Sequence, residues 1–245
     1  MIKITLFASL LTVLNLTASS QDALALGNRI LGGGITFSQN DSENVYRLST
    51  TLSNDDRTYN RFSYSFSPYY GRFYKDFNMV GLRLNTRGSN SEFDYRDDIR
   101  ADRTEFTYTS FSIGGFFRRY FPYSDKFGVF LETGIDGYRS RSIELRESYD
   151  IDVSSTLIRS RFEDERKSLG ISVDAKVGLY FFLLDRLSLE TRLSRFYLSY
   201  GDVQLLNVDL VNNEQAEAEG SNSSIDFSFV NNFSFDQIFT INYYF

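Results

Sequence analysis

The last twenty-one residues, Ile225 to Phe245, alternate apolar and polar side chains almost without interruption. Successive side chains of a β-strand point to opposite faces, so a period of two predicts a strand with one apolar, aromatic face. The aromatic positions continue to Phe245, whereas the ends of soluble proteins usually fray into polar residues. A transmembrane barrel strand, with its apolar face toward lipid, explains this pattern better than a strand of a soluble sheet.

The same alternation recurs in seven segments upstream of the last one. An even number of antiparallel strands closes with both termini on one side and leaves no unpaired edge in lipid. The predicted fold is therefore all-β, an eight-stranded antiparallel up-and-down transmembrane β-barrel that forms one domain over residues 21–245. Its expected strands are Arg29–Gln39, Tyr59–Tyr70, the stretch around Val80–Leu84, the stretch ending at Phe121, Phe127–Asp136, Leu169–Phe181, Leu187–Tyr200 and Ile225–Phe245.

The connections between these segments are alternately long and short. Short turns are expected at Gly71–Asp76, Pro122–Lys126 and Leu184–Arg186, and four long loops at Asn40–Thr58, Asn90–Arg103, Ser142–Arg166 and Asn212–Ser224. If both termini are periplasmic, the long loops face outward and are where an extracellular ligand would bind. Eight tilted crossings use only about 80 residues, so we expect much of the chain to protrude as extended strands and loops.

The amino terminus has the layout of a secretory signal peptide. Lys3 is followed by the apolar run Ile4–Leu16 and then by small residues up to Ser20. We expect cleavage after residue 20 and Sec-type export. The alternatives, a buried helix or a short membrane anchor, are less suitable because the apolar run is well below the roughly 20 residues of a spanning helix.

The chain contains no cysteine and no histidine. Disulfides, thiolate metal sites, an acylated cysteine anchor, serine–histidine or cysteine–histidine nucleophile pairs and the usual zinc sites are thereby excluded. A lipid-modifying enzyme that depends on histidine is excluded for the same reason. The formal net charge of −6 also argues against nucleic-acid binding, which requires a basic surface. We expect no enzyme, no cofactor, and no catalytic, cofactor-binding or metal-binding residue.

Charged residues collect on the face of the strands opposite the apolar residues. An eight-stranded barrel is just wide enough to be filled by side chains. We therefore expect these charges to pair inside the barrel as an electrostatic plug, rather than to line a conducting pore or to serve as a catalytic acid and base. The predicted inward charges are Arg83, Arg118, Glu132, Asp136, Asp174, Lys176, Glu190 and Arg192.

Three further patterns resemble binding motifs. The triplet Gly32–Gly34 lacks the lysine and helix of a phosphate loop, so close strand packing is the better interpretation. An acidic run lacks the spacing of a calcium loop and is interleaved with arginines, which predicts a solvated, self-paired loop. Its acidic residues are Glu92, Asp94, Asp97, Asp98 and Asp102, and its arginines are Arg96, Arg100 and Arg103.

Aromatic residues gather near the strand ends on the side of the short turns. A ligand-stacking platform is one interpretation, but a girdle at the membrane interface is the stronger one. The predicted girdle residues are Tyr69, Tyr70, Phe73, Tyr120, Phe121, Tyr123, Tyr243 and Tyr244.

A repeated unit combines a strand ending in Tyr and Phe, a short turn with Asp and a new apolar strand, as in Phe73-Tyr74-Lys75-Asp76-Phe77. Further copies are Tyr120–Phe127 and Tyr180–Leu187, and the chain ends on Phe239, Ile241, Tyr243 and Phe245. The pattern resembles the single-domain outer-membrane β-barrels of the outer-membrane protein A-like superfamily over about 32–245. This resemblance implies insertion among outer-membrane lipids, including lipopolysaccharide, and recognition of Phe245 by the barrel-assembly machinery. The peptidoglycan-binding function of the two-domain members is not expected here, because the resemblance covers the barrel alone.

We therefore expect a monomeric, non-enzymatic outer-membrane barrel with a structural or surface-recognition role. A narrow pore for ions or small solutes is the alternative. A soluble lipocalin-like barrel is the third possibility, but it would need its apolar residues inside and its charges outside.

Overall fold

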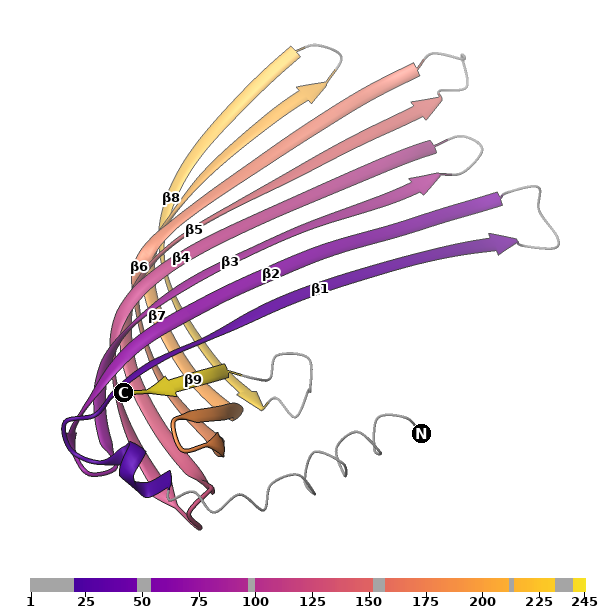
Figure 1. Ribbon diagram of the computed structural model, residues 1–245. Helices are drawn as coiled ribbons and strands as arrows, with labels where there is room; N and C mark the ends of the chain where they lie inside the picture. The colour runs from indigo at the N-terminus through magenta and orange to yellow at the C-terminus, as the bar shows by residue number, and fades with distance from the viewer. Residues whose placement is uncertain (1–19, 48–53, 97–99, 152–156, 212–213, 232–239) are drawn as a thin grey trace.

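The computed structural model describes residues 20–47, 54–96, 100–151, 157–211, 214–231 and 240–245, most of which lie in β-strands (Figure 1). A short 3₁₀ helix, η1 (Ser20–Leu24), precedes them. The strands are β1 (Arg29–Arg47), β2 (Asn54–Lys75), β3 (Asn78–Arg96), β4 (Arg100–Pro122), β5 (Phe127–Ile151), β6 (Leu157–Leu184), β7 (Leu187–Val211), β8 (Glu214–Asn231) and β9 (Thr240–Tyr244). No helix among the described residues has the length and apolar character needed to cross a membrane.

The strands form one antiparallel sheet that closes on itself. Strands β1 to β7 pair in chain order, and β9 pairs with β7 on one side and β1 on the other, where Ile241 lies opposite Leu189 and Gly33. Strand β8 pairs with the part of β7 beyond Ser194. The sheet is thus a ring of eight strands, β1–β7 and β9, which confirms the predicted eight-stranded up-and-down arrangement.

The two ends of this ring differ. The short turns lie at one end, here called the lower end, together with the start of β1 and the carboxyl terminus (Figure 1). There the Arg29 amide donates to the Phe245 carbonyl at 2.8 Å, and the Phe245 amide donates back at 2.9 Å. Four long β-hairpins extend from the opposite, upper end (Figure 1). The second and third short turns lie where the sequence predicts them, whereas the first is confined to residues 76–77, because β2 continues to Lys75 through most of the predicted turn Gly71–Asp76.

The outer face of the ring is apolar, as the alternation predicts. Each strand exposes its large aliphatic and aromatic side chains outward while the intervening residues face the interior. The exposed set includes Leu31, Ile35, Phe37, Phe62, Phe66, Val80, Leu82, Phe111, Ile113, Ile135, Leu169, Ile171, Phe196, Leu198, Phe227 and Ile241.

The prediction of four long loops is wrong over most of their length. The described parts of these polar stretches instead continue the antiparallel pairing of the strands. Strands β3 and β4 stay in register up to the pair Arg96 and Ala101, and β5 and β6 stay in register up to the pair Ile151 and Leu157. Opposite charges stabilise such pairing, since Arg103 reaches Glu92 at 2.6 Å and Glu105 at 2.7 Å. Within the predicted acidic run, Glu92 is therefore paired with Arg103, but in a strand and not in a loop, and Asp97 and Asp98 lie outside the described residues.

The last strand is also not continuous in register. Strand β8 ends with Asn231 opposite Ser194, and β9 begins with Thr240 opposite Glu190. The two described ladders are thus separated on β7 by only residues 191–193 and do not share one register. Phe233, Phe235, Gln237 and Phe239 lie outside the described residues.

Half of the predicted aromatic girdle points inward instead of outward. Tyr70, Phe121, Tyr123 and Tyr243 are exposed, whereas Tyr69, Phe73, Tyr120 and Tyr244 are buried in the barrel. The physical reason is that adjacent residues in a strand face opposite sides, so the pairs 69–70, 120–121 and 243–244 are divided between the two faces.

The buried aromatic residues form a packed floor at the lower end. Phe73 and Phe182 each contact the Tyr244 ring, with centroids 6.3 and 5.1 Å apart, and Tyr120 contacts Tyr180 at 5.2 Å. Leu24 of η1 joins this cluster and is almost fully buried. The floor closes the barrel interior with apolar side chains.

Candidate functional site: the barrel interior

A network of buried ion pairs lies directly above the aromatic floor, and Arg83 on β3 is one of its centres. Arg83 donates from Nε to Asp136 Oδ1 at 2.8 Å and from Nη2 to Asp136 Oδ2 at 2.7 Å, a bidentate pair. Its guanidinium also reaches Glu132 and Asp174, both at 2.7 Å. One cation thus joins three carboxylates on β5 and β6.

The second centre is Arg118 on β4. It donates to Glu132, at 2.9 Å from Nε and also from Nη2, and to both carboxylate oxygens of Glu190, at 2.9 and 2.7 Å. The hydroxyls of Tyr69 and Tyr120 each lie 3.0 Å from Nη1. The guanidinium also lies 4.8 Å from the Tyr69 ring centroid. Arg118 on β4 therefore links Glu132 on β5, Glu190 on β7 and Tyr69 on β2 across the interior.

Lys176 on β6 completes the network. Its ammonium lies 2.9 Å from Glu132 and 3.0 Å from Asp174, and Arg195 of β7 lies 2.9 Å from the same Asp174. Glu132 is consequently surrounded by Arg83, Arg118 and Lys176. Removing charges from water is costly, and close pairing with several hydrogen bonds offsets that cost.

Seven of the eight predicted inward charges meet in this network. They are Arg83, Arg118, Glu132, Asp136, Asp174, Lys176 and Glu190, each at most 6% exposed. The eighth, Arg192, also lines the interior, but it is exposed and forms no ion pair with a described residue. The predicted plug is thus found, and Arg192 lies beside it, near enough to Glu132 for the two charges to interact but beyond ion-pair distance.

An irregularity in β7 directly follows Arg192. Val177 lies opposite Ser194 and Gly178 opposite Arg192, so Leu193 is an extra residue in the β6–β7 ladder. A β-bulge of this kind re-aims the side chains that follow it. Inward positions are even up to Arg192 and odd from Arg195 onward, which is why Phe196, Leu198 and Tyr200 face outward.

Several buried polar partners escaped the sequence interpretation. Tyr69 donates to Asn242 Oδ1 at 2.6 Å, and the Asn242 amide donates to Ser188 at 3.2 Å, which links β2, β9 and β7. Parity within the strands would have found both tyrosines, because Tyr120 shares the face of the predicted inward Arg118, and Tyr69 shares the face of the polar residues Ser65 and Ser67. Arg195 required knowledge of the bulge.

Close packing explains two glycines. A Cβ at Gly32 would lie 2.1 Å from Asn242 Oδ1 and 2.6 Å from Tyr69 Cζ, consistent with the predicted close strand packing. A Cβ at Gly134 would lie 2.5 Å from Arg83 Nη2. The missing side chain at Gly134 leaves the room that the Arg83 guanidinium occupies.

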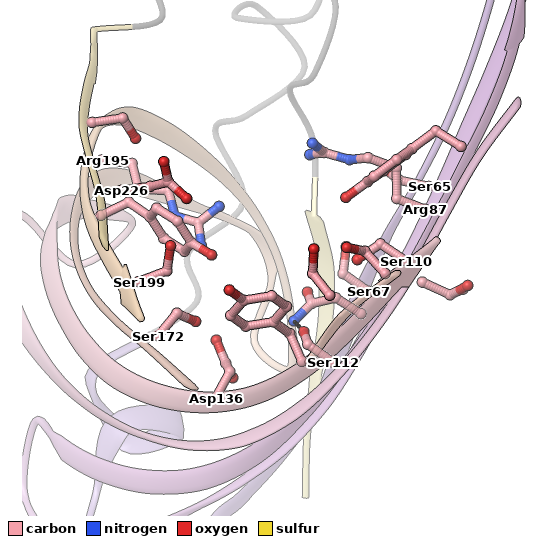
Figure 2. A pocket seen from close by; sticks show the side chains of 18 of the residues that line it. Ser65, Ser67, Arg87, Ser110, Ser112, Asp136, Ser172, Arg195, Ser199 and Asp226 are labelled. Carbon is pink, nitrogen blue, oxygen red and sulfur yellow. Dashed lines mark hydrogen bonds between the residues drawn. The ribbon is translucent and has the colours of Figure 1, made fainter. Parts of the chain in front are cut away.

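An open cavity of about 830 Å³ lies above the plug. Serine is the commonest residue in its lining, and Asp136 borders it from the plug (Figure 2). Lys176 of the plug also lines the cavity. Arg87 and Arg195 lie on opposite walls (Figure 2). The interior therefore has three layers, an aromatic floor, an ionic plug and a polar cavity.

The chemistry of the interior is that of ion pairing. Glu132, Asp136, Asp174 and Glu190 all accept hydrogen bonds from cations. Within the described part of the chain, no group of three or more His, Cys, Asp or Glu side chains is suited to hold a metal ion.

No protein-family model and no curated protein matches the chain. Among solved structures, it is similar to the outer membrane protein OprG from Pseudomonas aeruginosa, with a TM-score of 0.33 and 10% identity over 90% of this chain and 97% of that one. It is also similar to the transport unit of the autotransporter AIDA-I from Escherichia coli, with a TM-score of 0.27 and 11% identity over 97% of this chain and 95% of that one. Likenesses at this level do not define a function.

Proposed function

We propose that this chain is a non-enzymatic, integral outer-membrane β-barrel whose interior is closed by the ionic plug and whose long hairpins face outward. The observation that carries the proposal is the inverted polarity, with apolar side chains around the outside and paired charges inside. In water such an outer surface would be an unfavourably large exposed apolar patch. In a bilayer, a transmembrane barrel needs an apolar surface that faces the lipid chains. A lipocalin-like barrel would have the opposite arrangement.

The proposed role is structural or recognition at the cell surface. The hairpins carry alternating charges on rigid antiparallel ladders, which suits contact with an extracellular partner. We propose export after removal of residues 1–20, assembly as a monomer among outer-membrane lipids including lipopolysaccharide, and recognition of Phe245 by the barrel-assembly machinery. The resemblance to the outer-membrane protein A-like superfamily supports these steps.

Cell fractionation tests the location. We expect the full chain in the outer membrane, with heat-modifiable migration on detergent gels and cleavage by added protease confined to the ends of the four hairpins. Recovery in the soluble periplasm would contradict the proposal.

The cavity of about 830 Å³ favours a second candidate, a narrow pore for ions or small solutes. Below that cavity lie the plug and the aromatic floor, whose side chains are almost fully buried, and this burial supports the closed barrel over the pore. Planar bilayers decide between the two, because the closed barrel should be electrically silent and stepwise conductance would support the pore.

A further inference from the structure

The walls of the upper cavity carry more positive than negative charge, although the whole chain has a net charge of −6. Four arginines line it, one each on β3 and β6 and two on β7. They are Arg87, Arg166, Arg192 and Arg195, here called the cationic lumen. Apart from Asp136, which Arg83 holds in the plug, the only carboxylate in the lining is that of Asp226.

Three of these arginines form no ion pair with a described carboxylate, although Glu132 lies near enough to Arg192 for the two charges to interact. Among the described residues, no carboxylate lies within ion-pair distance of Arg87, Arg166 or Arg192, whereas Arg195 reaches Asp174 at 2.9 Å. Positive groups that face a shared concave space raise the local concentration of anions. The arrangement is therefore suited to an anionic ligand.

The bulge in β7 contributes directly to this arrangement. Inward residues of a regular strand are two apart, but the extra residue Leu193 lets both Arg192 and Arg195 face the interior. Bulges are over-represented next to functional sites, where they re-aim a side chain. Here the bulge places two cations on one wall, and Arg87 lies opposite Arg195 (Figure 2).

The remaining lining indicates what kind of anion fits. Ser65, Ser110, Ser172 and Ser199 present hydroxyls around the cavity (Figure 2), and hydroxyls can both donate and accept hydrogen bonds. Guanidinium groups match phosphate and sulfate oxygens in pairs. With about 830 Å³ available, the cavity is large enough for a ligand of sugar size.

We propose that the cationic lumen is a binding site for a small hydrophilic polyanion, such as a phosphorylated or sulfated sugar, that enters from the hairpin end. This goes beyond the proposed function, because a closed structural barrel needs no ligand. The ionic plug forms the bottom of the site, so the ligand leaves by the way it entered.

Calorimetric titration of the full mature chain in zwitterionic micelles tests the proposal, with inositol hexakisphosphate as the probe and uncharged myo-inositol as the matched ligand. We expect one probe molecule to bind per barrel and myo-inositol not to bind. Arg166→Ser and Arg192→Ser should each weaken binding by about tenfold, the loss expected for one charged hydrogen bond. Arg139→Ser, which removes the same charge from the outer face of β5, should leave affinity unchanged.

Heat-modifiable migration establishes that each variant is folded. If Arg192→Ser does not fold, Arg192→Lys keeps the charge and should bind within a few-fold of the native chain, while Arg166→Ser still reports the loss. The proposal is overturned if the native chain does not bind the probe, if myo-inositol binds equally well, or if Arg139→Ser weakens binding as much as the lumen variants do.

Discussion

Glu132→Gln is the most informative perturbation of the plug, because Glu132 is the carboxylate on which three buried cations converge. Arg83 lies 2.7 Å from it, Lys176 lies 2.9 Å from it, and Arg118 bonds it through two nitrogens. Glutamine has nearly the same shape, so the substitution removes the charge without opening a cavity. Its amide also turns one acceptor into a donor that faces cations.

The magnitude follows from what each cation retains. Arg83 keeps Asp136 and Asp174, Lys176 keeps Asp174, and Arg118 keeps Glu190. No cation is left wholly unpaired, but the buried network gains an uncompensated positive charge. Breaking a buried pair by removing one partner costs about 3–5 kcal/mol, and we expect the free energy of unfolding to fall by that amount.

Reversible urea unfolding in lipid vesicles, followed by far-ultraviolet circular dichroism and gel mobility, measures this loss. The matched control is Glu105→Gln, whose partner Arg103 lies 2.7 Å away on an exposed hairpin. An exposed pair contributes about 0–1 kcal/mol, so the control should unfold almost like the native chain. If Glu132→Gln is as stable as Glu105→Gln, the plug is not a stabilising network and the reasoning is refuted.

A steric perturbation of the same network leaves its charge unchanged. The Cβ of Gly134→Ala would lie 2.5 Å from Arg83 Nη2, so the guanidinium must move away from its three carboxylates. Overpacking of this kind costs about 1–3 kcal/mol. Gly137→Ala is the control, because its Cβ would meet nothing nearer than Ile113 O at 4.0 Å. Equal unfolding of the two alanine variants would argue against the tight fit at Arg83.

Two further predictions concern the ring and the hairpins. The chain has no native cysteine, and Leu31 and Tyr243 are register partners across the β1–β9 closure, so a short thiol cross-linker should join Leu31→Cys to Tyr243→Cys. The control pair, Leu31→Cys with Leu169→Cys, should not be cross-linked. Equal cross-linking yields for the two pairs on a gel would contradict ring closure. Hydrogen bonds, first from Lys167 and then from Arg141, hold the pKa of the Glu165 carboxyl below its ordinary 4.5. The stabilisation of the β5–β6 hairpin by the ionised Glu165 is therefore present above pH 4.5 and is lost as the pH falls through the lowered pKa. Hydrogen-exchange protection factors of the hairpin should fall over that pH range, and Glu165→Gln should remove this pH dependence.

One rule, the alternation of side chains along a strand, predicted the number of strands in the ring, the apolar outer face and the charged residues of the plug. Glu132, Asp136, Asp174 and Lys176 were assigned inward by parity, and they do meet. Parity needs no knowledge of which strand lies beside which. It therefore survives errors in loop length, such as the polar stretches that form ladders instead of loops.

The predictions of which face a residue occupies were wrong in two situations. In one the alternation rule was not applied, and in the other the ladder changes register. The girdle prediction grouped Tyr69 with Tyr70 by composition, although neighbours in a strand must diverge. The extra residue Leu193 shifts the phase of β7, and the sequence shows only the result at Phe196. Which charges come within ion-pair distance depends on the full set of cross-barrel distances, and Arg192, which forms no ion pair with a described residue, shows that a correct face does not determine a partner.

The three layers of the interior bear on two alternative roles for a small barrel, conducting solutes and binding them. A conducting pore needs a polar path through the whole ring, but the polar lining here ends at Asp136 and Lys176, where the plug begins. Below them the interior is aromatic around Tyr120 and Tyr244. A cavity that is cationic at the top and closed underneath can retain a solute without passing it on. We therefore propose binding without conductance, and Glu132→Gln, which weakens the plug and keeps all four arginines of the cationic lumen, should preserve probe binding while it lowers stability.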